Sequence, residues 1–292
     1  MKFGYSSNAF RRYPLLRVMD MVADIGFTGV ELLADFPHLW PDDWTDEARL
    51  SGLRAAIDRR GLTVTNLNTF TMFAVGGFGY PSWISSQPDD RRARREYTRD
   101  CIRLAARLGA PTVTVMPGGR RNRDPWDDRR TAYATFRDGL RRLIPMAAEL
   151  GVKVLIEPEP DCLIERYTEF LEFVSTLEPA EASHVGMNCD VGHLVCAGDD
   201  PATVIRECGS WIRHVHVEDI KNRVHEHLIC GLGDIDFVQV LGALDSIGYA
   251  GYVTVELYPY QDTPMEAGRQ SLEHLVGCYE RVVAGETKSA TR

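Results

Sequence analysis

Several features of other protein classes are missing from this sequence of 292 residues. It has no run of about 18 or more apolar residues, the length that a membrane-spanning helix needs. The N-terminal segment MKFGYSSNAF lacks the apolar core of a signal peptide. The seven cysteines are scattered, form no CxxC pair and are odd in number, so a secreted disulfide framework is not expected. We therefore expect a soluble, cytoplasmic protein with reduced thiols and no membrane partner.

An excess of positive charge is also missing. Lys and Arg number 33 against 42 Asp and Glu, which gives a formal net charge of −9. Binding to a nucleic-acid backbone needs a basic face, so this balance disfavours nucleic acid as the main partner. Hydrophobic residues make up 44% and charged residues 26%, as in an ordinary globular protein that buries a large core.

Short β-rich runs alternate with amphipathic helical patterns along the whole chain. The predicted strands are Phe3–Asn8, Thr28–Leu33, Leu62–Asn68, Thr112–Pro117, Val152–Glu157, His184–Asp190, Ile212–Asp219 and Tyr252–Leu257. The predicted helices are Tyr13–Ile25, Asp46–Arg60, Arg91–Leu108, Asp128–Leu150, Thr168–Leu177, Pro201–Ser210, Phe237–Ile247 and Met265–Val283. Glycines such as Gly26 and Gly109 follow several of these helices directly, as expected of residues that close a helix in the left-handed conformation.

This alternation predicts an α/β fold with a parallel sheet. Eight strands, each followed by a helix, are the number that closes a barrel, so we expect a single (β/α)8 TIM barrel. An open doubly wound sheet is the alternative, but no GxGxxG follows the first predicted strand. The expected barrel covers residues 1–284, and residues 285–292 form a polar, flexible tail.

Two long connections break the regular spacing. Residues 69–87 follow the third predicted strand and are rich in glycine and aromatic residues, and residues 118–127 follow the fourth and contain three arginines. Both lie on the side where barrel enzymes build their sites, so they are candidates for lids or substrate walls. Ordinary insertions or subunit contacts are the alternative.

Acidic residues and histidine recur at the ends of predicted strands five to eight, as Glu157, Asp190, His216 and Glu256. On each strand the alternation of side chains places the polar residue opposite an apolar side that suits packing under helices, so all four should face into the barrel. Three buried carboxylates would repel one another unless a cation binds them. This oxygen-rich set predicts one divalent metal at the C-terminal ends of strands five to eight. Mn²⁺ is the first choice, and Mg²⁺, Co²⁺ or Zn²⁺ would also fit.

At this point the chain resembles the xylose isomerase-like TIM-barrel superfamily of sugar isomerases and epimerases. The segments that carry the resemblance are GFTGVEL, IEP, CDVGH, HVHVED, GLGDIDF and GYAGYVTVEL, in that order along nearly the whole chain. The ketose 3-epimerase branch implies metal ligands at Glu157, Asp190, His216 and Glu256, with the two glutamates also acting as the catalytic acid/base pair. The Asp-x-x-His pattern of the family falls on Asp190 and His193 and implies a contact between His193 and substrate oxygen.

The chemistry of such a site agrees with this implication. Removal of a proton beside a carbonyl needs a base within reach and a stabiliser for the enediolate, which a metal supplies. With Glu157 and Glu256 on opposite faces, proton return inverts the centre, whereas transfer on one face between adjacent carbons isomerises an aldose and a ketose. The predicted function is therefore a metal-dependent sugar, or sugar-like polyol, isomerase or epimerase acting on a small carbohydrate. We expect a homodimer or homotetramer from the family.

Four further residues are candidate substrate contacts. Glu31 ends the second predicted strand and would face the mouth of the barrel, with a structural salt bridge as the alternative. Asn68 ends the third predicted strand, where turn formation is the alternative. His227 and Arg223 follow the seventh predicted strand, and a solvated surface charge is the favoured alternative for Arg223. At His225-Glu226-His227 the nucleases of the superfamily carry an Asp-x-His pair, and because His225 replaces the Asp we expect substrate contact rather than a second metal.

Three other functions compete. An inosose dehydratase-type lyase would use the same metal and base to expel a β-hydroxyl group. An abasic-site endonuclease would need histidine ligands after strands three and four, where this chain has Asn66, Asn68, Met116 and Pro117. A barrel that only binds or assembles has no need for both Glu157 and Glu256.

Overall fold

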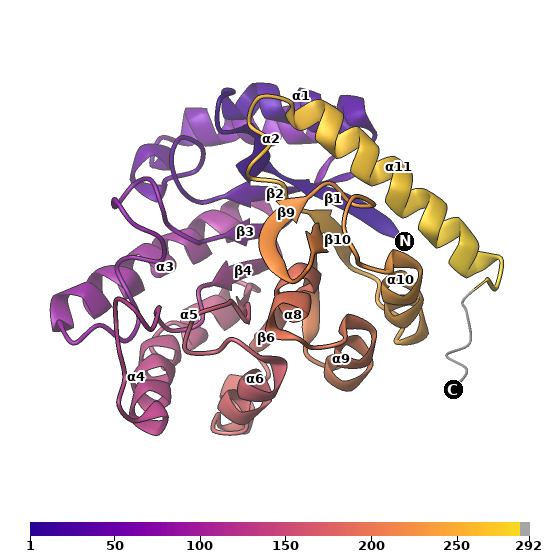
Figure 1. The fold of residues 1–292 in the computed structure, drawn as a ribbon. Coiled ribbons are helices and arrows are strands. Elements are labelled where there is room, and N and C mark those ends of the chain that lie inside the picture. Colours follow the sequence, from indigo (N-terminus) through magenta and orange to yellow (C-terminus); the bar gives the residue numbers. More distant parts are fainter. Residues whose placement is uncertain (287–292) are drawn as a thin grey trace, which may run out of the picture.

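A computed structural model describes residues 1–286 and confirms the predicted single (β/α)8 barrel (Figure 1). Within this range eight parallel strands close in the order β1-β10-β7-β6-β5-β4-β3-β2. They are β1 (Lys2–Ser6), β2 (Gly29–Leu33), β3 (Thr63–Asn68), β4 (Thr112–Val115), β5 (Lys153–Ile156), β6 (Val185–Asp190), β7 (Ile212–Val217) and β10 (Tyr252–Val255). Residues 287–292, most of the predicted tail, lie outside the described residues.

Helices surround the barrel (Figure 1). They are α1 (Leu15–Ile25), α2 (Glu47–Arg59), α3 (Pro88–Leu108), α4 (Arg129–Arg141), α5 (Ile144–Glu149), α6 (Tyr167–Val174), α7 (Pro179–Ala182), α8 (Val191–Ala197), α9 (Pro201–Cys208), α10 (Phe237–Ser246) and α11 (Pro264–Val283). Two 3₁₀ turns, η1 (Ser7–Phe10) and η2 (Pro41–Trp44), follow β1 and β2. None of the described helices is both long and apolar enough to cross a membrane.

The structure differs from the predicted elements in three places. The helix predicted over 128–150 is two helices, because Pro145 has no N–H to donate and α5 starts anew there. The seventh strand stops at Val217, and a hairpin of β8 (Asp219–Lys221) and β9 (Val224–Leu228) follows it. The short α8 was not predicted, although Asp190 caps its start and Gly198 closes its end in the left-handed conformation. The predicted closing role of Gly26 and Gly109 is confirmed by their φ angles of 113° and 73°.

The predicted alternation of side chains along the strands places polar groups inside the barrel. Val215, Val217 and Val253 are buried on the outer side, in the core formed with the helices. Inside the barrel, the Asn66 amide donates to Glu31 Oε2 and to Thr114 Oγ1, both at 2.8 Å. A polar layer therefore fills the barrel beneath the site.

The long connection after β3 is held by two buried charged side chains. The Asp35 carboxylate accepts hydrogen bonds from the backbone amides of Met72, Phe73 and Ala74 at 2.7, 2.8 and 2.9 Å. From α3, the fully buried Arg94 donates to the carbonyl oxygens of Thr69 and Pro81 and to the hydroxyl of Thr71. The peptide groups of this connection are therefore bound on both their N–H and their C=O sides, which gives it a fixed shape.

Removal of the Asp35 carboxylate should show that the shape of this connection depends on it. We expect Asp35→Ala to lower the free energy of unfolding by about 2–4 kcal/mol, because three amides lose a charged acceptor. Urea denaturation followed by circular dichroism measures the loss, and limited proteolysis should show new cleavage within residues 72–79. Asp58→Ala, at an exposed position on α2, is the matched control and should change stability by less than about 0.5 kcal/mol. Equal stability of the two variants would contradict this role for Asp35.

Candidate active site

The structure brings the four predicted metal ligands together at the C-terminal end of the barrel. Glu157 follows β5, Asp190 ends β6, His216 lies near the end of β7 and Glu256 follows β10. The register pairs His216 with Asp190 of β6, so these two side chains lie at the same height, and with Thr254 of β10, so Glu256 lies two residues further along its strand direction. Their charged or polar atoms surround His216 Nδ1, which is 2.8 Å from Glu157 Oε1, 3.7 Å from Asp190 Oδ2 and 3.8 Å from Glu256 Oε2.

His216 lies between carboxylates on both sides of its ring. Its Nε2 is 2.6 Å from Glu31 Oε2, deeper in the barrel, while its Nδ1 faces Glu157. Burial opposes the charged imidazole, but Glu31, Glu157 and Glu256 together raise the pKa of His216 well above its usual value. Because a carboxylate can only accept, the Nε2 proton belongs to the bond with Glu31, and Nδ1 can face Glu157 only with a proton or a cation between them.

Glu31 therefore has a different position from the one predicted. It is fully buried and does not line the cavity, but supports His216 and also lies 3.2 Å from His214 Nε2. The charged form is stabilised there: burial raises the pKa of Glu31, yet the two histidines lower it well below its usual value. The alternation of side chains was predicted correctly, whereas the depth of Glu31 in the barrel was not.

Asp190 combines a structural and a site role. Its Oδ1 accepts a 2.7 Å hydrogen bond from the backbone amide of His193 and so caps α8. Its Oδ2 is buried and has no hydrogen-bond partner among the described residues. An ionised buried oxygen without a donor is costly unless a cation binds it. The orphaned Oδ2, the His216 Nδ1 and the surrounding carboxylates therefore fit a divalent cation with nitrogen and oxygen ligands.

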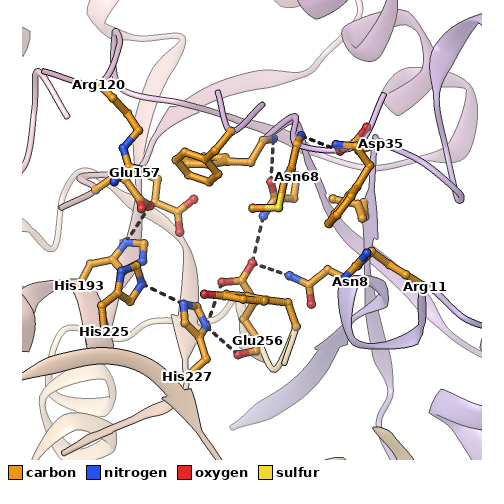
Figure 2. Close-up of a pocket in the computed structure, with 17 residues that line it drawn as sticks. Asn8, Arg11, Asp35, Asn68, Arg120, Glu157, His193, His225, His227 and Glu256 are labelled. Atoms are coloured by element: carbon orange, nitrogen blue, oxygen red, sulfur yellow. Dashed lines mark hydrogen bonds and ion pairs between the residues drawn. The ribbon is translucent and has the colours of Figure 1, made fainter. Parts of the chain in front are cut away.

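Glu256 is oriented by two amides, one from the segment after the neighbouring β1 and one from the end of β3. Its Oε1 accepts from Asn8 Nδ2 at 2.8 Å and from Asn68 Nδ2 at 3.2 Å, so the predicted Asn68 does line the cavity (Figure 2). Burial raises the pKa of Glu256 well above its usual value. Burial also raises the pKa of Glu157, to about 7, against the lowering effect of His216. Both glutamates can thus hold a proton near neutral pH.

Three imidazoles form the neighbouring wall of the cavity (Figure 2). His193 Nδ1 lies 3.0 Å from the carbonyl oxygen of Pro158 and His227 Nδ1 lies 3.0 Å from that of Glu256, so each Nδ1 is the donor and each Nε2 keeps its lone pair. Burial lowers the pKa of His193 to about 4 and that of His227 to about 3, which keeps both rings neutral. His225 Nε2 lies 3.0 Å from His227 Nε2. Both predicted residues line the cavity, but only His193 keeps a free Nε2 there, because the Nε2 of His227 is bonded to His225.

Arg223 does not reach the site. It is exposed in the turn between β8 and β9, where Asn222 and Arg223 have φ angles of 53° and 60°, and it does not line the cavity. The structure therefore gives no support to the predicted substrate contact of Arg223, because the tight turn directs the chain away from the mouth.

Sequence reasoning missed several residues of the cavity. Asn8, Arg11 and Glu159 all line the cavity, although none of them is among the site residues predicted from the sequence. Burial raises the pKa of Glu159 well above its usual value. The position of Asn8 directly after a strand was a usable signal, whereas Arg11 is brought in only by the packing of distant segments.

The chain was compared with known proteins. A family model described as "Xylose isomerase-like TIM barrel" matches residues 19–278. A 2-oxo-tetronate isomerase of Pectobacterium atrosepticum is 25% identical, over 87% of this chain and 90% of its own length. A 3-dehydro-D-guloside 4-epimerase of Escherichia coli is 26% identical, over 95% of this chain and 100% of its own length. The crystal structure of a D-tagatose 3-epimerase-like protein superimposes with a TM-score of 0.81 at 24% identity, over 98% of this chain and 100% of the other.

The family match spans most of the chain, and curated relatives of nearly full length include sugar isomerases, epimerases and inosose dehydratases. The barrel, its polar interior and the carboxylates at its C-terminal end were all expected from the sequence segments that resemble this superfamily. The chain belongs to the xylose isomerase-like TIM-barrel family.

Proposed function

We propose that this chain is a divalent-metal-dependent isomerase or epimerase of a sugar or a sugar-like polyol. The observation that carries the proposal is the placement of Glu157 and Glu256 at one cavity (Figure 2), where both face Nδ1 of the buried His216. The orphaned oxygen of Asp190 lies beside them. The sugar isomerases and epimerases among the relatives support the same reaction class.

Each residue then has a chemical task. Glu157 accepts or returns the proton of the carbon beside the substrate carbonyl. Glu256 exchanges a proton on the other face and is held in place by the amides of Asn8 and Asn68. His193 accepts a hydrogen bond from a substrate hydroxyl group through Nε2, and His227, whose Nε2 is bonded to His225, lines the cavity beside it. A divalent cation, with Mn²⁺ as the first candidate, would be held by Glu157, Asp190, His216 and Glu256 and would supply Lewis-acid stabilisation of the charge on the substrate oxygens.

One carboxylate on each face of the substrate favours epimerisation, since a proton removed from one face can be replaced by a proton added to the other face. A dehydratase of the inosose type would use the same residues and is distinguished by its product, which lacks a hydroxyl group. Homodimer or homotetramer formation and a cytoplasmic location remain predictions from the sequence. The nuclease alternative has little support, because β3 ends in the amides of Asn66 and Asn68, which bond Glu31 and Glu256.

The two glutamates should be indispensable for turnover. We expect Glu157→Gln and Glu256→Gln each to lower kcat by at least about a hundredfold, because a carboxamide cannot exchange the proton. Deuterium exchange from solvent into substrate, followed by NMR, measures the proton transfer directly. Glu226→Gln, at an exposed position of the β8–β9 hairpin, is the matched control and should retain full activity. Wild-type exchange in either site variant would overturn the two-carboxylate mechanism.

Metal removal should affect both activity and stability. We expect dialysis against a chelator to abolish turnover and to lower the Tm, because an ion that binds only the folded state stabilises it, by about 2.7 kcal/mol at one hundred times its Kd. Differential scanning calorimetry with and without added Mn²⁺ measures this difference. A chelated protein of unchanged Tm and full activity would refute metal dependence.

The contact between Glu31 and His216 should tune metal affinity. We expect Glu31→Gln to weaken Mn²⁺ binding about 10–100-fold, as for other carboxylates that orient a histidine ligand. Isothermal titration of the chelated protein with Mn²⁺ measures the Kd without reference to turnover. The same titration of Glu226→Gln should give the wild-type value, and equal Kd values for all three proteins would remove Glu31 from the metal site.

A further inference from the structure

The cavity has two chemically different halves. At its floor are the carboxylates and imidazoles of the site. At its mouth, the connection after β3 contributes the side chains Phe70, Met72, Phe73 and Phe78, which we call the apolar wall. Met72 is 38% and Phe73 44% exposed, although large apolar side chains are normally buried. Apolar groups that remain exposed beside a polar site mark a surface for an apolar ligand.

The cavity is also large for a free monosaccharide. Its volume is about 460 Å³, within the range of roughly 300–1,000 Å³ typical of pockets that enclose drug-sized molecules. A free ketose offers the apolar wall only the C–H groups of its ring, which is less apolar surface than a sugar with an apolar substituent offers. The space and its lining therefore fit a sugar that carries an apolar substituent.

Other contacts in the structure hold the residues of the apolar wall in place. The three amide hydrogen bonds to Asp35 fix the backbone from Met72 to Ala74. Phe73 is covered on one face by the Arg11 guanidinium, 3.9 Å from its ring centroid, and Phe78 lies 5.7 Å from Phe70 between ring centroids. Tyr258, 37% exposed, continues this aromatic lining from the segment after β10.

From this arrangement we propose that the substrate is a keto-glycoside: a sugar ring with a ring ketone at the floor of the cavity and an apolar or aromatic aglycone on the apolar wall. The inference rests on the proposed function. Because the aglycone blocks the anomeric carbon, the ring cannot open, and the carbonyl must be a ring ketone. The reaction is then an epimerisation: the C–H bond beside the ketone breaks, its proton passes to one glutamate, and the other glutamate returns a proton to the opposite face.

The test compares three substrates that share one sugar: a free keto-hexose, its methyl keto-glycoside and its phenyl keto-glycoside. We expect the phenyl compound to have a KM at least about tenfold below that of the methyl compound, because only the phenyl group buries apolar surface on the wall. Phe73→Ala should raise the KM of the phenyl compound about tenfold and change that of the methyl compound less than about twofold. Phe73→Leu should restore part of the difference.

Leu16→Ala, an exposed apolar position on α1 away from the cavity, is the control and should change neither KM. Equal KM values for the phenyl and methyl compounds, or a free sugar turned over best, would overturn the glycoside proposal while leaving the isomerase or epimerase function standing. An equal effect of Phe73→Ala on both glycosides would also overturn it, since the wall would then act on the sugar. Absence of exchange and turnover with all three substrates would instead count against the proposed function itself.

Discussion

An imidazole held between carboxylates organises the centre of this barrel. His216 bonds Glu31 through one ring nitrogen and faces Glu157, Asp190 and Glu256 with the other. The arrangement brings together residues of β2, β6 and β7 and the residues that directly follow β5 and β10, so the geometry of the site depends on closure of the sheet. It also explains the polar interior beneath the site, where Asn66 donates to Glu31 and to the hydroxyl of Thr114.

The sequence was sufficient for the barrel and for the meeting of four polar residues at one rim. Strand ends in a parallel barrel meet at one rim, and the period of two decides which side chains face inward, so Glu157, Asp190, His216 and Glu256 could be predicted without coordinates. The depth of the Glu31 side chain in the barrel could not be predicted in this way. The pairing of β2 with β3 shifts register between Val30 and Glu31, which is a property of two strands together and leaves no mark on either one alone.

The cavity walls were the least predictable part. Arg11 reaches Phe73 only because the segment after β1 packs beside the connection after β3, and Asp35 finds its amide donors 37 to 39 residues away. Such contacts depend on tertiary packing, which no local pattern reports. The turn at Asn222 and Arg223 shows the same limit. Both residues have left-handed backbone conformations, which the sequence did not predict, and Arg223 does not line the cavity although it follows β7 closely in the sequence.

The opposed anchoring of the connection after β3 has a kinetic consequence. Asp35 binds its amides and Arg94 binds its carbonyls, so the segment is ordered before any ligand arrives. A ligand that meets a surface already in place spends none of its binding free energy on ordering a loop. Association at this mouth is then governed by diffusion and desolvation, and differences in affinity among ligands arise in their residence times.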